Sequence, residues 1–163
     1  MMSTGGALGA VGISTAGAAT ARSAAAHAAT GMTLAYPRLA VCKASALPLN
    51  QAIAFRYPDL SSHCYAIRLG SPAPGGVGPN SDIVAYSGMC THMGCPVAYA
   101  PETKSFKCGC HFSMFDAEMG GQMITGQATE DLPRVLLEFD ANTGTVQAVG
   151  IDGLLYGRQA NLL

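Results

Sequence analysis

Two short stretches of the chain carry residue types that bind metals. Cys90 and His92 stand in the first stretch, Cys108 and His111 in the second, and fifteen residues separate His92 from Cys108. Each stretch supplies one thiolate, which suits ferric iron bridged by sulfide, and one imidazole. Two cysteines and two histidines can hold a [2Fe-2S] cluster, with the cysteines on one iron and the histidines on the other. Because imidazole is neutral, such a cluster has a higher reduction potential than one held by four cysteines.

The same four side chains have two other interpretations. Two cysteines and two histidines also form tetrahedral zinc sites, and they could instead be unrelated disulfide and core residues. A further pair, Cys95 and Cys110, favours the cluster because each stretch carries one extra cysteine at a matching place. A disulfide between them would tie together two loops that must hold four ligands rigidly, and it needs an oxidising compartment.

The sequences C-T-H-M-G-C at 90–95 and C-x-C-H-x-S at 108–113 resemble the Rieske iron–sulfur proteins. The likeness is to the disulfide-bearing form of cytochrome bc complexes and arsenite oxidases. It implies one [2Fe-2S] cluster and a defined set of ligands. It assigns one iron to Cys90 and Cys108, the other iron to His92 and His111, and a disulfide to Cys95 and Cys110.

Two residues beyond the last ligand bear on the reduction potential. In the Rieske family, a serine at the place of Ser113 donates a hydrogen bond to a bridging sulfide, and a tyrosine at the place of Phe115 donates one to a ligand sulfur. This chain keeps the serine and has phenylalanine at the second place. Because hydrogen bonds stabilise the more negative reduced cluster, we expect a potential below that of relatives with both donors.

Further stretches resemble the small subunit of arsenite oxidases over roughly residues 36–163. These are the runs at 75–85, 111–116, 126–129 and 154–158. The resemblance implies a heterodimer, in which a large subunit with a molybdenum–pterin centre and a [3Fe-4S] cluster oxidises arsenite. This chain would pass the electrons to a periplasmic cytochrome c or copper protein.

That resemblance also implies where the electrons would pass. Outer-sphere transfer would occur at the edge where His92 and His111 reach the surface, and no substrate site is expected on this chain. The alternative is the quinol-oxidising Rieske subunit of a cytochrome bc complex. Residues 126–129, however, read G-Q-A-T where that family has a Gly-Pro-Ala-Pro loop.

The residues around the ligands predict strands that position them. From residue 39 onward, short alternating apolar runs are broken by Gly and Pro, which predicts an all-β fold. We expect a Rieske-like antiparallel sandwich or barrel, with a cluster-binding subdomain of two loops at about 88–116. A third loop at 126–133 could lie beside the cluster, and 141–144 reads as a hairpin turn. Strands are expected at 39–43, 52–57, 63–69, 82–87, 97–100, 105–107, 134–139 and 145–151.

Composition sets the size and the class of partner. The chain has 163 residues, and we assign 36–163 to one domain of ordinary size. Only 12% of the residues are charged and the formal net charge is −1. Nothing therefore favours nucleic acid, and the low charge fits a chain pressed against a large partner.

Residues 1–35 differ in composition from the rest. No residue from Met1 to Ala21 is charged, and Arg22 is the only basic residue of this segment. It resembles an export signal of the twin-arginine type, although no Arg pair precedes it, so we expect the native start to lie upstream. A retained N-terminal anchor and a disordered tail are the alternatives. Export predicts a periplasmic location, with membrane association only if the segment is retained.

Two more cysteines, Cys42 and Cys64, fall in expected strands. We expect two buried free thiols, since cysteine is commonly buried. A second disulfide between adjacent strands is the alternative, given the exported context.

Overall fold

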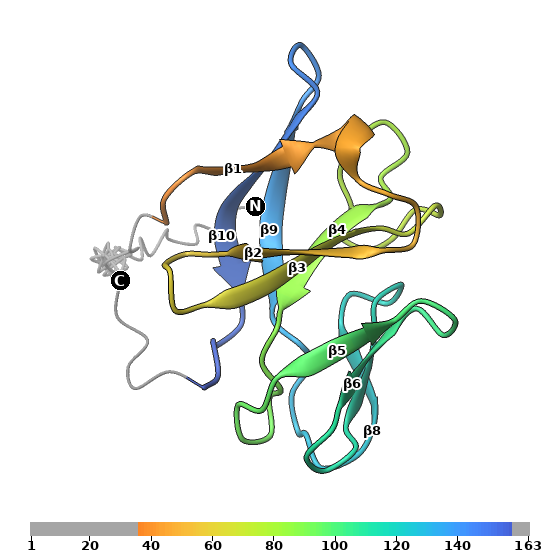
Figure 1. Ribbon diagram of the computed structural model, residues 1–163, viewed down its shortest axis with the longest axis vertical. Helices are drawn as coiled ribbons and strands as arrows, with labels where there is room; N and C mark the ends of the chain where they lie inside the picture. The colour runs from red at the N-terminus through yellow and green to blue at the C-terminus, as the bar shows by residue number, and fades with distance from the viewer. Residues whose placement is uncertain (1–35, 158–163) are drawn as a thin grey trace, which may run out of the picture. The chain divides into compact units, whose positions relative to one another are not determined.

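This computed structural model describes residues 36–157, which contain ten strands and one 3-10 turn (Figure 1). Six strands form one antiparallel sheet in the order β1-β10-β9-β4-β3-β2, and four form a second in the order β5-β6-β7-β8. The elements are β1 (Leu39–Lys43), η1 (Ala44–Ala46), β2 (Ala52–Arg56), β3 (His63–Arg68), β4 (Ile83–Ser87), β5 (Val97–Ala100), β6 (Ser105–Cys108), β7 (Met114–Asp116), β8 (Gln122–Thr125), β9 (Arg134–Asp140) and β10 (Thr145–Asp152).

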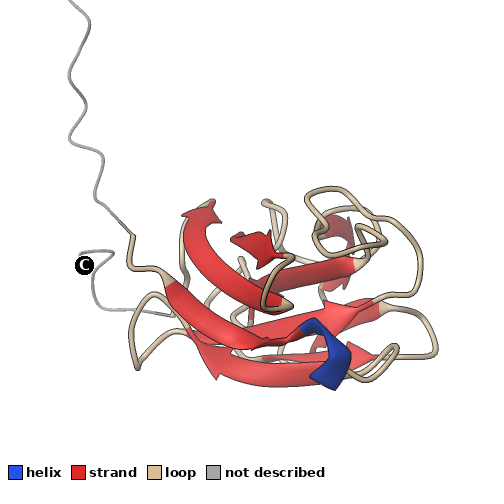
Figure 2. Ribbon diagram, turned by 90° about the horizontal axis from the view of Figure 1, so that it is seen from above, coloured by secondary structure: helices blue, strands red, loops and turns tan. Residues whose placement is uncertain are grey.

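The all-β prediction is confirmed. All eight expected strands are present, and their ends differ from the expected ones by at most one residue. Figure 2 shows that strands and loops make up nearly all of the described chain, with η1 as its one helical turn. Strands β7 and β8 complete the small sheet, so this sheet extends past residue 116, where we expected the subdomain to end. Within residues 36–157, no helix is long and apolar enough to cross a membrane.

The β9–β10 hairpin shows how local chemistry sets a turn. The Asp140 carboxylate accepts a hydrogen bond from the backbone N–H of Asn142 (2.9 Å). Gly144, which donates its N–H to the Asp140 carbonyl (2.7 Å), has a φ of +68°. Glycine adopts this left-handed conformation without steric cost. The expected hairpin turn at 141–144 is therefore confirmed.

Strand β4 is buried on both faces because it lies between two cores. Its residues Ile83 and Ala85 pack in the core of the large sheet with residues of β9 and β10. The alternate residues Val84 and Tyr86 face the second core, which includes residues of the small sheet. Side chains alternate across a strand, so this one strand links the large sheet to the ligand-bearing part of the molecule.

The small sheet is an insertion between two paired strands of the large sheet. β4 pairs with β9 at Tyr86 and Arg134, and the N–H of Ser87 donates to the carbonyl of Pro133 (2.8 Å). The chain therefore leaves the large sheet and re-enters it at nearly the same point. Everything between these residues, including all four proposed ligands, belongs to the inserted part.

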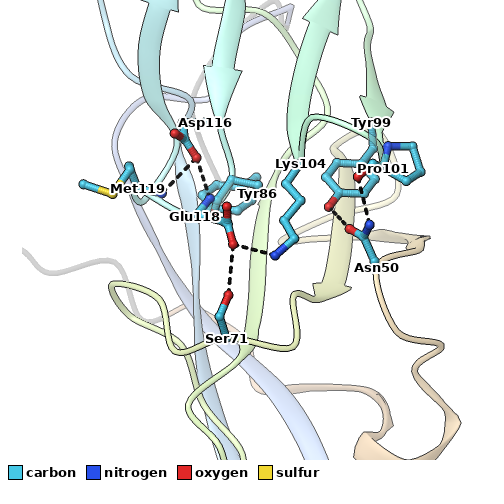
Figure 3. Close-up of polar contacts among 10 residues, drawn as sticks. Asn50, Ser71, Tyr86, Tyr99, Pro101, Lys104, Asp116, Glu118 and Met119 are labelled. Atoms are coloured by element: carbon cyan, nitrogen blue, oxygen red, sulfur yellow. Dashed lines mark hydrogen bonds and ion pairs between the residues drawn. The ribbon is translucent and has the colours of Figure 1, made fainter.

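Polar contacts fasten the small sheet to the rest of the molecule (Figure 3). They join side chains of the large-sheet part to backbone and carboxylate oxygens of the small-sheet part. This attachment complements the apolar core between the two parts and gives the ligand loops a fixed base. The contacts are Tyr86 OH to Ala117 O (2.7 Å), Asn50 Nδ2 to Pro101 O (2.8 Å) and Ser71 Oγ to Glu118 Oε1 (2.9 Å).

The second disulfide that we considered is not formed. Cys42 and Cys64 are both free thiols, and they lie on β1 and β3, which are not neighbours in the sheet. Cys64 is buried as expected and donates its S–H to the carbonyl of Tyr57 (3.4 Å). Cys42 is only half-buried, because β1 is an edge strand.

Candidate metal centre

The first ligand loop, residues 88–96, connects β4 to β5. The N–H of Cys90 donates to the carbonyl of Cys95 (2.7 Å), and the N–H of Gly94 donates back to the carbonyl of Cys90 (2.9 Å). Gly94 has a φ of +72°, which lets the chain turn back toward β5. These bonds close a tight loop with the Cys90 side chain inside and His92 near its outer edge.

The second ligand loop, between β6 and β7, repeats this backbone arrangement. The N–H of Cys108 donates to the carbonyl of Ser113 (2.9 Å), and the N–H of Phe112 donates to the carbonyl of Cys108 (3.2 Å). Phe112 has a φ of +62° and so occupies the left-handed position that Gly94 occupies in the first loop. The two loops lie at the lower end of Figure 1.

Two contacts hold the loops against each other. The structure contains the disulfide between Cys95 and Cys110 that the family resemblance implies, with a Cα–Cα distance of 6.5 Å. The imidazoles of His92 and His111 meet edge-on, with 3.2 Å between their Nδ1 atoms. The structure thus brings together the six side chains that the sequence singled out.

The four candidate ligands differ in burial by residue type. Cys90 and Cys108 are 1% and 3% exposed, whereas His92 is half-buried and His111 is exposed. Burial raises the pKa of the Cys90 thiol, a hydrogen bond from the His92 backbone lowers it, and the neighbouring Cys108 thiol raises it further. The arrangement offers two sulfurs from the protein interior and two nitrogens at the surface.

The disulfide between Cys95 and Cys110 lies beside the Cys108 thiol but adds no metal ligand. The sulfurs of Cys95, Cys108 and Cys110 lie within 4.8 Å of one another. Two of these atoms form the disulfide, and a disulfide sulfur carries no thiolate charge with which to bind a metal. The proximity therefore shows that the disulfide packs directly against the Cys108 thiol.

Ser113 joins the second loop to the loop at 126–133. Its fully buried hydroxyl oxygen accepts the N–H groups of Gln127 and Ala128, both at 3.0 Å. A hydroxyl has two acceptor positions and one proton, so the proton remains free for Cys90, whose pKa the Ser113 side chain lowers. A hydroxyl beside a buried cysteine sulfur is one of the groups that tune the potential of an iron–sulfur cluster, and two buried thiols with two imidazoles are ligands that such a cluster accepts, so the residues fit this cofactor.

Phe115 lies in the apolar core behind the ligands. Its ring is fully buried in the cluster of side chains that also contains Cys90 and Cys108. It supplies packing and no hydrogen-bond donor. Because residue 115 has no hydroxyl, Ser113 is the side-chain hydroxyl that the described residues place next to these thiols, beside the backbone N–H of His92.

Sequence reasoning missed two supports of the first loop. Thr91 donates its hydroxyl to the carbonyl of Glu130 (2.6 Å), so the loop at 126–133 contacts both ligand loops. Gly94 packs against Gly157, and a Cβ added at Gly94 would lie 2.5 Å from the Gly157 backbone. In the sequence, the one hint of such a close approach was that a glycine, Gly94, stands inside the first ligand motif. The loop at 126–133, which we expected beside the cluster, contacts both loops that carry the proposed ligands.

Comparisons with known proteins agree with this geometry. A family model described as the Rieske [2Fe-2S] domain matches residues 38–136. The iodate reductase subunit IdrB of Denitromonas iodatirespirans is 37% identical over 129 residues, which are 77% of this chain and 69% of that protein. The IdrB of Pseudomonas sp. (strain SCT) is 36% identical over 125 residues, which are 75% of this chain and 64% of that protein. The chain thus spans less than two thirds of the second relative.

More distant matches agree with the family and with the fold. The cytochrome bc1 complex Rieske iron–sulfur subunit of Streptomyces lividans is 41% identical over 69 residues, covering 42% of this chain and 40% of that protein. The soluble domain of Rieske protein II from Sulfolobus acidocaldarius superposes with a TM-score of 0.69 at 24% identity. It covers 76% of this chain and 82% of that structure.

Proposed function

Because this chain belongs to the Rieske [2Fe-2S] protein family, we propose that it is the electron-transfer subunit of an oxidoreductase complex, with arsenite oxidase as the first candidate. The Rieske domain binds a [2Fe-2S] cluster, which supplies one-electron transfer when bound. The chain's own residues hold the cluster, tune it and bring it to the surface. The substrate is converted on another subunit.

The proposed ligands are Cys90 and Cys108 for one iron and His92 and His111 for the other. The observation that carries this assignment is the contrast in burial: both thiols lie inside, and both imidazoles meet at the surface with 3.2 Å between their Nδ1 atoms. Electrons therefore enter and leave at the histidine edge. Ser113 is the proposed donor to the cluster sulfur, and Phe115 leaves the second donor position empty.

The proposed partner is a large molybdopterin-containing catalytic subunit, and the proposed acceptor is a periplasmic cytochrome c or copper protein. The runs at 75–85 and 154–158 support arsenite oxidase. The likeness to two iodate reductase subunits supports iodate reduction as the second candidate, in which electrons would flow toward the catalytic subunit instead. The match to cytochrome bc1 subunits covers only 42% of the chain, which makes quinol oxidation the weaker alternative.

A periplasmic location is part of the proposal. The disulfide between Cys95 and Cys110 supports it, because disulfides persist in oxidising compartments and are rare in the cytosol. The predicted export signal or anchor at 1–35 lies outside the described residues.

The test is to purify the native complex through a tag on this chain and follow its cluster by electron paramagnetic resonance. Iron, acid-labile sulfide, molybdenum and zinc are counted first, and zinc without sulfide would overturn the cofactor. Arsenite added to the oxidised complex should produce the signal of the reduced cluster. If arsenite has no effect and iodate reoxidises a reduced complex, the second candidate replaces the first. Reduction by quinol in a preparation with haem and no molybdenum would refute both.

A further inference from the structure

Three sulfur atoms lie together where the two ligand loops meet. The sulfurs of Cys95, Cys108 and Cys110 lie within 4.8 Å of one another. Cys95 and Cys110 form the disulfide, whereas Cys108 has a free thiol. Thiol–disulfide exchange proceeds by attack of a thiolate on a disulfide sulfur. The fold therefore places the two reactants of this exchange side by side.

The burial of the three residues favours one product of the exchange. Attack on the Cys95 sulfur joins Cys95 to Cys108 and releases Cys110 as a thiolate. Cys110 is exposed and Cys95 is half-buried, so water stabilises the departing charge better at Cys110. Attack on the Cys110 sulfur would instead join two cysteines separated by one residue in the same loop, where disulfide geometry is strained.

Cys108 is the thiol placed to attack this disulfide. Its side chain is 3% exposed, so dissolved oxidants and thiols have little access to it. The Cys90 thiol is also buried and neighbours Cys108, but its sulfur is not among the three that lie within 4.8 Å of one another. Uncatalysed disulfide rearrangement takes minutes to hours, and a buried thiol reacts at the slow end of that range.

We propose that Cys108 exchanges with the Cys95–Cys110 disulfide whenever the folded chain lacks its cluster, and that the product is a Cys95–Cys108 disulfide. The Cys108 thiol gives its proton to solvent, its sulfur bonds to the Cys95 sulfur, and the old S–S bond breaks. The Cys110 thiolate then takes up a proton. One disulfide and one thiol are present before and after the step, so no oxidant or reductant is consumed.

The exchange makes the order of assembly matter, a consequence that rests on the proposed function because it takes Cys108 as an iron ligand. A chain with the Cys95–Cys108 bond has lost one of its four ligands and no longer accepts the cluster. A chain that is loaded first keeps the Cys108 sulfur on iron, which prevents the attack. The reaction that supplies the cluster must therefore act before the disulfide forms, or faster than the exchange.

The test follows disulfide connectivity in the full chain. A chelator strips the cluster under argon, and the chain is kept at about pH 8, where part of the thiol population is ionised. Samples are quenched with acid, unfolded and labelled with N-ethylmaleimide, and fragmentation mass spectrometry locates the label. The native pairing leaves the label on Cys108, and the exchanged pairing leaves it on Cys110. We expect label on Cys110 to grow over hours, and on the order of tenfold more slowly in the cluster-loaded chain.

Two matched variants identify the attacking thiol. Cys90→Ser and Cys108→Ser each replace a buried free cysteine of the same core. Each also removes a proposed ligand, so both chains are compared without a cluster. We expect label on Cys110 to grow in Cys90→Ser at the wild-type rate, within about twofold, and to stay absent in Cys108→Ser.

Three results would overturn the exchange. One is a cluster-free chain that keeps Cys108 free throughout the incubation. Another is growth of label on Cys110 in Cys108→Ser but not in Cys90→Ser, which would assign the attack to Cys90. The third is a new disulfide at Cys42 or Cys64, which lie elsewhere in the fold, because it would show that the reaction needs an unfolded chain.

Reconstitution with iron and sulfide tests the consequence for assembly separately. The freshly stripped chain should regain its paramagnetic signal, and the exchanged chain should regain it only after reduction of its disulfide. Equal uptake by the exchanged and the fresh chain would overturn that consequence. If the fresh, fully reduced chain takes up no iron–sulfur cluster, the proposed function fails, while the connectivity series still decides whether Cys108 exchanges.

Discussion

Removing the hydroxyl of Ser113 should affect two properties, the stability of the loop at 126–133 and the reduction potential of the cluster. In Ser113→Ala, the N–H groups of Gln127 and Ala128 lose their acceptor, and the Cys90 sulfur loses its donor. The site is fully buried, so water does not readily replace the lost partners. The substitution should therefore lower both the stability of the loop at 126–133 and the reduction potential.

The size of each effect follows from the bonds that are lost. An unsatisfied buried N–H costs about 1–3 kcal/mol, so two of them lower the free energy of unfolding by roughly 2–6 kcal/mol. A hydrogen bond to a charged group contributes about 1.5–3 kcal/mol. We take about half of this energy as the amount by which the bond stabilises the reduced cluster more than the oxidised one. Because a one-electron couple shifts about 59 mV per 1.4 kcal/mol, losing the bond should lower the reduction potential by roughly 30–65 mV.

The assay is a redox titration of the cluster-loaded chain followed by electron paramagnetic resonance, with urea unfolding on the same samples. Ser105→Ala is the matched control, because Ser105 is also a buried serine of the small sheet but bonds to Thr103. We expect the control to leave the potential unchanged. The reasoning is refuted if Ser113→Ala keeps the wild-type potential, or if Ser105→Ala lowers the potential by the same amount.

Three further variants test other parts of the site and core. Phe115→Tyr should raise the potential, because a hydroxyl in the core that contains the ligand thiols can donate to their sulfur; a redox titration that shows no rise contradicts this. Replacing Cys95 and Cys110 with serine should lower the stability of the cluster-free chain by about 3 kcal/mol, the entropy of a loop of this length, and an unchanged urea midpoint argues against it. Burial raises the pKa of the Cys64 thiol from 9.0 to about 12, so the folded state keeps a proton that the unfolded state releases. The protonated thiol therefore stabilises the folded state fully below pH 9, and this contribution is lost as the pH rises toward 12. In Cys64→Ala, the free energy of unfolding should fall less steeply with pH in this range. If it falls as steeply as in the wild type, the pKa of Cys64 is not the cause.

The sequence predicted the strands well because their signal is local. The alternation at 134–139 and the turn at 141–144 depend on neighbouring residues alone, and the structure places both as expected. The ligand set was also readable, since each half of the motif is a short run of unusual residue types. Strands β7 and β8 were not among the expected strands. β7 has only three residues, and β8 has one neighbour and mostly exposed side chains, so their sequences carry little pattern.

Other features could not be read because they depend on distant contacts. The approach of Gly157 to Gly94 joins the C-terminal segment to a ligand loop, and no periodicity encodes such a pair. The left-handed backbone of Phe112 is equally hidden, because its residue type argues against that conformation. The failure of Cys42 and Cys64 to pair follows from strand order, which alternation along single strands does not reveal.

The insertion of the small sheet has a consequence for how this domain can change over time. The chain leaves at Ser87 and returns at Pro133, two residues joined by a hydrogen bond, so the excursion is a single long loop. Loop length costs little entropy, and the inserted part can therefore lengthen, shorten or gain a new docking surface while the large sheet keeps its pairing. Complete removal is a different matter, because Val84 and Tyr86 would then face water. The small sheet can therefore vary in its outer loops, but the face of β4 that carries Val84 and Tyr86 requires that the sheet itself remain.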